Sequence, residues 1–217
     1  FSRKQMVENG ACVENGEVIF VLDGKKKRVM PTEEIYIPGN HNLENALAAT
    51  ALTMLAGVPA NIVRHTLKTF KGVEHRIETV RTVDGVTYIN DSKGTNVDAS
   101  VQAVRAMKAG TVLLAGGYDK HIPFAPLAPE VVQHVKLLIL CGATADAIEK
   151  AVRDCPDYQG SPEIVRCESL EDCVQTAYER AVSGDIVTLS PACSSFDLFK
   201  NFEERGNTFR AIVESLQ

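Results

Sequence analysis

Three short polar segments, residues 90–96, 116–120 and 190–196, combine residue types that suit a binding site for an anionic molecule. Their glycines allow the backbone to approach a ligand closely, and their hydroxyl groups donate or accept hydrogen bonds. Lys93 and Lys120 add positive charge to two of the segments. Helix amino termini beside these lysines would complete an anion-binding rim. A dicarboxylate or a phosphorylated ligand fits this chemistry.

Each polar segment directly follows a predicted β-strand. These strands are predicted at residues 86–90, 111–115 and 185–190. In an open α/β sheet, ligands bind beyond the carboxyl ends of the strands, so the three segments should meet at one edge. The alternative interpretation is that they are only turns and helix caps. Asp91 or Asn96 would then cap one helix, and Ser194 or Ser195 would cap the last one.

Strands and helices alternate from residue 73 to residue 217. Strands are predicted at 77–83, 86–90, 111–115, 135–140, 163–166 and 185–190, and helices at 97–107, 129–134, 144–152, 170–182 and 199–216. Two of the strands are apolar on both faces, as is typical of strands buried between two layers of helices. The pattern therefore predicts an α/β fold with a Rossmann-like, doubly wound sheet.

Residues 1–72 begin with short strands and tight turns. Asn15-Gly16 and Asp23-Gly24 predict two hairpins, because these dipeptides tolerate the positive φ angles of such turns. The basic run at 25–28 is interpreted as part of a solvated hairpin turn rather than a polyanion site.

Helices are predicted after a break at Pro38-Gly39, over residues 41–56 and 60–70. Leucines recur among alanines in the first of these helices and give it an apolar stripe, namely Leu43, Leu47, Leu52 and Leu55. We expect residues 1–72 to belong to a separate domain from residues 73–217.

The overall composition is that of an ordinary globular protein. The net charge of −5 and the isoelectric point near 5.6 give no electrostatic reason to expect nucleic acid as the main partner. The sequence contains no apolar run of about 18 residues, so no membrane span is expected. The six cysteines form no C-x-x-C pair, which suits a reducing cytoplasm better than a disulfide framework.

Several motifs of nucleotide and metal chemistry do not occur in the sequence. There is no G-x-x-x-x-G-K-[ST] phosphate loop, no G-x-G-x-x-G fingerprint and no H-E-x-x-H metal motif. The chain starts at Phe1 rather than at methionine, and this start does not resemble a signal peptide. A truncated amino terminus would account for this start, although the sequence does not tell whether the gene product begins near Phe1.

The three polar segments occur in order behind two further motifs, GNHNLENA at 39–46 and EHR at 74–76. Together with the sequence LSPACSSFDLFKNFEERG at 189–206, this set resembles the Mur ligase family of ATP-dependent amide-forming enzymes. The last segment is most similar to the branch that adds D-glutamate. The resemblance covers nearly all 217 residues. It implies that residues 1–72 end a central ATP-binding domain and that residues 73–217 form an amino-acid-binding domain.

The resemblance also implies roles for individual residues. The residues implied to bind the nucleotide are Asn42, Asn45, Arg76, Asp91 and Lys93, with Lys93 near the phosphates. The residues implied to bind D-glutamate are Thr95, Lys120, Ser195 and the backbone of Phe202. Asp119 and Ser194 would support them, or would be purely structural. The family more often has alanine at the position of Gly94, so a small residue is retained there.

The implied activity is the addition of D-glutamate to UDP-N-acetylmuramoyl-L-alanine in peptidoglycan precursor synthesis, in the cytoplasm. ATP and Mg²⁺ are the implied cofactors, with the phosphate loop and the metal ligands expected outside this sequence, so that the chain alone should be inactive. Two alternatives stay open. One is a related Mur or folylpolyglutamate-type ligase, and the other is a non-catalytic binding module derived from such an enzyme. The sequence does not indicate an oligomeric state.

Overall fold

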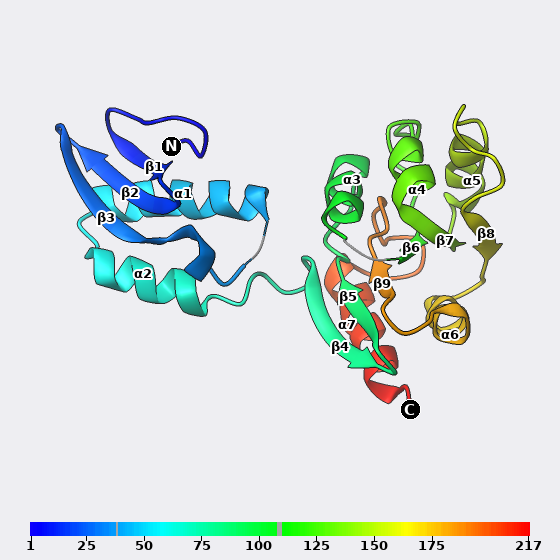
Figure 1. Cartoon of the computed structure of the whole chain (residues 1–217). Coiled ribbons are helices and arrows are strands. Elements are labelled where there is room, and N and C mark those ends of the chain that lie inside the picture. Colours follow the sequence, from blue (N-terminus) through cyan, green and yellow to red (C-terminus); the bar gives the residue numbers. More distant parts are fainter. Residues whose placement is uncertain (38, 108–109) are drawn as a thin grey trace. The chain divides into compact units, whose positions relative to one another are not determined.

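The chain divides into two compact units, Phe1–Gly72 and Val73–Gln217 (Figure 1). The computed structural model describes residues 1–37, 39–107 and 110–217. Pro38, at which the sequence predicts a break, lies outside the described residues. Each unit has its own sheet and its own hydrophobic core.

The first unit is built on a three-stranded antiparallel sheet in the order β1-β2-β3. Its elements are β1 (Gly10–Glu14), β2 (Glu17–Leu22), β3 (Lys25–Pro31), a short 3-10 turn (Thr32–Glu34), α1 (Asn40–Leu55) and α2 (Ala60–Thr69). Asn15 and Gly16 have φ angles of 50° and 78°, and Asp23 and Gly24 have φ angles of 51° and 73°. Both predicted hairpin turns are therefore confirmed.

The predicted leucine stripe of α1 is only partly correct. Leu47 is buried, whereas Leu52 and Leu55 are 71% and 55% exposed. The buried face of α1 consists mostly of small residues, namely Ala46, Leu47, Thr50 and Ala51. At about 100° per residue, Leu52 points well away from Leu47, which lies five positions earlier. The alanines allow the helix to pack closely on the sheet.

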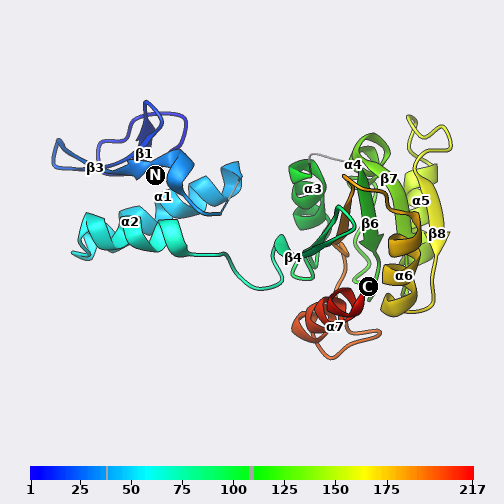
Figure 2. The same ribbon diagram turned by 60° about the horizontal axis from the view of Figure 1, so that its bottom comes forward.

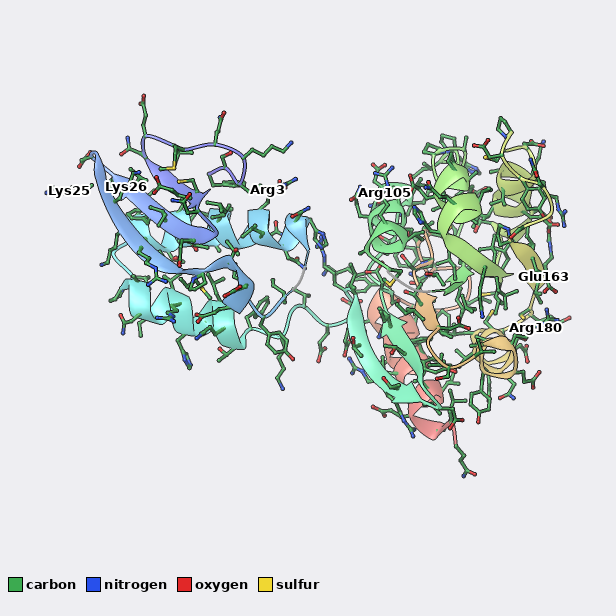
Figure 3. All side chains as sticks on the ribbon, viewed as in Figure 1. Arg3, Lys25, Lys26, Arg105, Glu163 and Arg180 are labelled. Atoms are coloured by element: carbon green, nitrogen blue, oxygen red, sulfur yellow. The ribbon has the colours of Figure 1, made fainter. Side chains whose placement is uncertain are left out.

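The basic run at 25–28 is exposed, as expected, but it forms the first half of β3 rather than the turn itself. Figure 3 shows Lys25 and Lys26 near the tip of the hairpin between β2 and β3. Lys26 and Arg28 form ion pairs of 2.6 Å with Glu14 and Glu17. These cations are thus partly neutralised by carboxylates of β1 and β2.

The second unit contains a six-stranded sheet in the order β4-β5-β9-β6-β7-β8. Its strands are β4 (Glu78–Val83), β5 (Val86–Asn90), β6 (Thr111–Ala115), β7 (Val135–Leu140), β8 (Glu163–Arg166) and β9 (Ile186–Leu189). Only β4 is antiparallel to its neighbour, and the other described pairs are parallel. The last strand in the sequence, β9, lies between β5 and β6 in the middle of the sheet.

Helices cover both faces of this sheet (Figure 1 and Figure 2). They are α3 (Val97–Ala106), α4 (Ala128–His134), α5 (Ala145–Arg153), α6 (Leu170–Arg180) and α7 (Phe202–Ser215). Helices α3, α4 and α5 bury one face in one hydrophobic core, and α6 and α7 bury the opposite face in another. The predicted doubly wound α/β architecture is confirmed. None of the helices in the described ranges combines the length and apolarity needed to cross a bilayer.

Candidate functional site

The three polar segments lie next to one another at the carboxyl edge of the sheet. We call residues 90–96, 116–120 and 190–196 the first, second and third loops. Because β9 lies between β5 and β6, the third loop lies between the other two. The Asp91 amide donates to the Leu189 carbonyl at 2.8 Å, and the Gly116 amide donates to the Pro191 carbonyl at 2.9 Å. The predicted convergence of the loops is therefore confirmed.

Asp91 is a buried carboxyl group that joins the first loop to the third. It is only 4% exposed, and it accepts a hydrogen bond from the Ser190 hydroxyl at 2.7 Å and one from the Ile77 amide at 3.2 Å. Burial raises the pKa of Asp91 to about 6, although these two bonds and the charge of Arg76 oppose the change. Each carboxylate oxygen can accept two hydrogen bonds, so capacity for a ligand hydroxyl remains.

Arg205, on α7, is the main residue of the edge that the sequence analysis missed. It is 3% exposed, and burial lowers the pKa of its guanidinium to about 10, so the group stays charged at neutral pH. It donates to the Ser92 hydroxyl and carbonyl at 3.0 and 2.9 Å, and to the carbonyls of Cys193 and Ser194 at 3.1 and 3.2 Å. The Arg205 guanidinium therefore connects the first loop to the third through hydrogen bonds.

A buried threonine performs the same task between the second and third loops. Thr144, just before α5, is 1% exposed, and its hydroxyl lies 3.1 Å from the Gly117 amide and 3.2 Å from the Cys193 sulfur. The Tyr118 amide also donates to the Ser194 carbonyl at 3.0 Å. The third loop is thus held from both sides.

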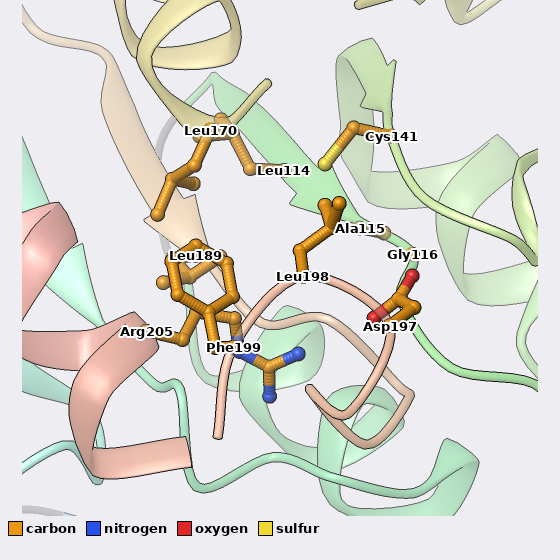
Figure 4. A pocket seen from close by; sticks show the side chains of 11 residues that line it. Leu114, Ala115, Gly116, Cys141, Leu170, Leu189, Asp197, Leu198, Phe199 and Arg205 are labelled. Atoms are coloured by element: carbon orange, nitrogen blue, oxygen red, sulfur yellow. The ribbon is translucent and has the colours of Figure 1, made fainter. Parts of the chain in front are cut away.

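A small cavity is lined by Gly116 and Gly117 of the second loop and by residues 197–199, which follow the third loop (Figure 4). Its volume is about 10 Å³, and its lining is mostly apolar, with Asp197 and Arg205 as the charged members. One oxygen of Asp197 accepts from the Ala143 amide at 3.1 Å. A cavity of this size holds about one water molecule, so it is not a site for an amino acid or a nucleotide.

The structure brings together two of the residues predicted to bind the amino acid. The Lys120 ammonium donates to the backbone carbonyl of Thr95 at 3.0 Å, which joins the second loop to the first. Lys120 is exposed and Thr95 is half-buried, so both remain accessible at the edge. Asp119 accepts from the His121 amide at 2.6 Å, which indicates a role in the loop turn.

The other two predicted amino-acid contacts belong to the third loop and to the start of α7. Ser195 is 2% exposed, and its carbonyl accepts from the Phe199 amide at 2.8 Å. Phe202 is the first residue of α7, and its carbonyl accepts from the Ser92 hydroxyl at 2.8 Å. The Lys93 ammonium lies 4.9 Å above the Phe202 ring, within cation–π range. The first loop therefore also packs against the beginning of α7.

The residues predicted to bind the nucleotide are divided between the two units. Arg76 is exposed in the second unit, close enough for its charge to act on Asp91. Asn42 and Asn45 are in the first unit, three positions apart near the start of α1, and so lie on one face of that helix. The assignments of all three to a nucleotide remain predictions.

The helix-cap alternative is correct for Asn96 and wrong for Asp91, Ser194 and Ser195. The Asn96 side chain caps α3 by accepting from the Ala99 amide at 2.9 Å. The last helix is capped by Asn201, which accepts from the Glu204 amide at 2.7 Å, and not by Ser194 or Ser195. The predicted start of that helix at residue 199 was too early. The helix begins at Phe202, because the Asn201 side chain accepts a hydrogen bond from an amide of the first turn.

Gly94 provides space that alanine would fill. A β-carbon at this position would lie 2.6 Å from one carboxylate oxygen of Asp91 and 3.0 Å from the Ser190 hydroxyl. A small residue is retained here, as the sequence indicated, but glycine and alanine make different contacts at this position. Alanine would require the Asp91 carboxylate to move.

The position of Arg205 on its helix is a feature of the sequence that could have identified it as part of the site. Arg205 precedes the buried Phe209 by four residues, and hence lies on the buried face of α7. A charged residue on an apolar face needs a local partner, and here backbone carbonyls supply it. Among residues 1–37, 39–107 and 110–217, no group of three or more His, Cys, Asp or Glu side chains is arranged to hold a metal ion.

The doubly wound sheet and the lysines, hydroxyls and glycines at its carboxyl edge define an α/β domain suited to binding a small anionic ligand. Residues 75–193 match the sequence family described as "Mur ligase, glutamate ligase domain". The chain belongs to the Mur ligase family.

Two relatives illustrate the similarity in sequence. The chain is 49% identical, over its whole length, to the UDP-N-acetylmuramoylalanine–D-glutamate ligase of Thermoanaerobacter sp., and 44% identical to that of Alkaliphilus oremlandii. In both alignments it covers 47% of the relative. The chain thus spans about half the length of the curated relatives it matches.

Solved structures show the same fold at low sequence identity. The UDP-N-acetylmuramate-alanine ligase of Thermotoga maritima superposes with a TM-score of 0.64 at 16% identity, covering 95% of this chain and 46% of that one. FolC of Escherichia coli, in complex with ADP, gives a TM-score of 0.63 at 17% identity, covering 94% and 46%.

Proposed function

We propose that this chain is the amino-acid-binding part, together with some of the nucleotide-binding part, of an ATP-dependent ligase. The ligase joins D-glutamate to UDP-N-acetylmuramoyl-L-alanine in the cytoplasm, during peptidoglycan precursor synthesis. The names of the relatives at 49% and 44% identity support this substrate pair. The six cysteines are free, which accords with a reducing compartment.

The observation that carries the proposal is the contact between Lys120 and Thr95 at the edge where the third loop carries Ser195. D-glutamate has two carboxylates, and its recognition requires two groups of hydrogen-bond donors. In our proposal, Lys120 and Thr95 hold the α-carboxylate. Ser195 and the Phe202 amide hold the side-chain carboxylate. That amide belongs to the first turn of α7, whose N–H groups have no acceptor within the helix.

The reaction proceeds in two steps in this proposal. The γ-phosphoryl group of ATP is transferred to the carboxylate of UDP-N-acetylmuramoyl-L-alanine, which gives an acyl phosphate and ADP. The amine of D-glutamate then attacks the acyl carbon, the amide bond forms, and inorganic phosphate leaves. The second unit contributes mainly orientation of the amine, which is worth up to ~7–11 kcal/mol in favourable intramolecular reactions.

The residues of the second unit fit part of an ATP site. Arg76 and Lys93 are exposed cations on either side of the Asp91 position in the sequence, and both can attract phosphate oxygens. Asp91 is largely ionised above its pKa of about 6 and can then accept from a ribose hydroxyl. In the first unit, Asn42 and Asn45 are assigned to the adenine.

Mg²⁺ neutralises phosphate charge in reactions of this type. Its fit to this chain is poor, because the described residues offer no cluster of three or more metal-ligating side chains. We therefore assign the metal ligands and the phosphate loop to the half of the relatives that this chain does not span.

The proposal is tested by the amino-acid specificity of the full-length enzyme. Phosphate release is measured with UDP-N-acetylmuramoyl-L-alanine, ATP and one of D-glutamate, L-glutamate or diaminopimelate. We expect turnover with D-glutamate and at most a few per cent of that rate with the others. Preference for L-glutamate or diaminopimelate would favour a related Mur or folylpolyglutamate-type ligase. Binding of ligand without phosphate release would favour a non-catalytic module.

A further inference from the structure

The third loop contains a backbone turn that needs external support. Ala192 has a φ angle of +58°, in the left-handed region that non-glycine residues seldom occupy. Ala192 is 4% exposed, so water does not satisfy its amide. A strained residue of this kind persists only where its surroundings hold it in place.

Ser100 on α3 provides that support. Its hydroxyl oxygen accepts from the Ala192 amide at 2.9 Å. The Ser100 hydroxyl donates its proton to the Ser190 carbonyl at 3.2 Å, and the two serine hydroxyl oxygens lie 2.9 Å apart. The Ser190 hydroxyl in turn donates to Asp91 at 2.7 Å. Ser100 therefore completes a buried chain of hydrogen bonds from Asp91 to the turn at Ala192.

The helix itself has no need of this hydroxyl. Ser100 is 0% exposed and lies on the same face as the buried Val97, Val101 and Val104. Serine is a poorer helix former than alanine, and burying a hydroxyl costs free energy unless it is hydrogen-bonded. The partners that repay this burial all belong to the loops and not to α3.

We propose that Ser100 is a positioning residue for amino-acid binding. It fixes the turn at Ala192, and this turn sets the course of the third loop toward Ser195, three residues later. The inference rests on the proposed function, because it takes Ser195 as a contact of the D-glutamate carboxylate. Ser100 itself does not touch the substrate.

The first test is the effect of Ser100→Ala on the kinetics of the full-length enzyme. Loss of a buried hydrogen bond to a strained turn should raise the KM for D-glutamate about tenfold. The KM for ATP should change less than about twofold, because Asp91 keeps its own hydrogen bonds from Ser190 and Ile77, and the cations assigned to the phosphates are not part of this chain. A general loss of folding would instead lower the active fraction and leave both KM values unchanged.

Thr188→Val is the matched control. Thr188 is on β9, in the strand that leads into the third loop, and it is 0% exposed. Its hydroxyl has no hydrogen-bond partner among the residues that the structure describes. Valine has the same shape, so the KM for D-glutamate should stay within about twofold of the unsubstituted enzyme. Equal increases in Ser100→Ala and Thr188→Val would overturn the proposal, as would an unchanged KM in Ser100→Ala.

Hydrogen exchange of the Ala192 amide in the same proteins separates this inference from the proposed function. Exchange should be about tenfold faster in Ser100→Ala and unchanged in Thr188→Val. If the unsubstituted enzyme forms no amide with D-glutamate, the proposed function fails first, and the role of Ser100 in amino-acid binding fails with it. Unchanged exchange in Ser100→Ala would refute the positioning role whatever the substrate is.

Discussion

Arg205 reaches across the sheet edge to Ser92 and binds it twice, through the hydroxyl at 3.0 Å and through the backbone carbonyl at 2.9 Å. The same guanidinium also binds two carbonyls of the third loop. A planar guanidinium group with five N–H donors can bind all four of these acceptors, whereas a lysine ammonium with three donors cannot. Arg205 is therefore the residue on which the alignment of the first and third loops depends most.

Arg205→Lys should lower the free energy of unfolding of the second unit by about 2–4 kcal/mol, because a buried cation loses some of its acceptors. Urea denaturation followed by circular dichroism measures this change. Arg180→Lys is the control, since Arg180 is 44% exposed and pairs at 2.5 Å with the 63% exposed Glu163 (Figure 3). An exposed pair contributes at most about 1 kcal/mol. Equal losses in the two variants would contradict the role of Arg205.

Asp91→Asn should flatten the pH dependence of stability between pH 4 and pH 6. Burial raises the pKa of Asp91 to about 6, so the folded state binds this proton more tightly than the unfolded state. The stabilisation that the protonated Asp91 carboxyl gives to the folded state is fully present below about pH 4 and is lost as the pH rises through about 6. Above that pH, Asp91 no longer makes the free energy of unfolding depend on pH. Within this window, the Asp91 proton changes the free energy of unfolding by about 1.4 kcal/mol per pH unit.

Other carboxyl groups titrate with the opposite sign, because cationic partners lower the pKa of Glu130 and Glu149. The informative quantity is therefore the difference in unfolding free energy between Asp91→Asn and the unsubstituted protein at each pH. This difference should grow in favour of the variant from pH 4 to pH 6. Parallel curves would show that Asp91 is not held in a buried, poorly solvated position.

Gly94→Ala should destabilise the second unit by about 1–3 kcal/mol, because the new methyl group would overlap the Asp91 carboxylate. Thermal unfolding provides the measurement. In an Asp91→Ala background most of this cost should vanish, since the overlapping oxygen is gone. A full cost in both backgrounds would mean that the backbone, rather than the carboxylate, requires glycine.

Lys120→Ala in the full-length enzyme should raise the KM for D-glutamate strongly, by about tenfold or more, because the variant loses a charge-assisted contact to the α-carboxylate. The KM for ATP should change little. Lys150→Ala, which removes a 75% exposed lysine of α5 paired with Asp154, serves as the control and should have no effect. If the KM for D-glutamate is unchanged, Lys120 has no role in substrate binding and only braces the Thr95 carbonyl.

The architecture of the second unit follows from sequence patterns because its strands are apolar and its turns carry distinctive residues. The strands Thr111–Ala115 and Val135–Leu140 were predicted with the same limits as in the structure. The convergence of the three loops also followed, because parallel strands present their carboxyl ends at one edge. Helix ends were less accurate. The start of α7 depends on the Asn201 side chain, which local patterns did not reveal.

The supporting residues of the site were not predictable in the same way. Ser100, Thr144 and Arg205 act through contacts that span at least 11 positions in the sequence, and composition does not indicate such partners. What the sequence does offer is a polar residue on an otherwise apolar face, as at Ser100 and Arg205. The apolar stripe through Leu52 is not the buried face of α1 for the complementary reason, since that face consists mostly of small residues.

The most direct test of the account is a crystal structure of the full-length enzyme with D-glutamate bound. We expect the α-carboxylate within hydrogen-bond distance of Lys120 and Thr95, and the side-chain carboxylate within the same distance of Ser195 and the Phe202 amide. Density for the amino acid at any place other than the carboxyl edge of the second unit's sheet would contradict the central claim.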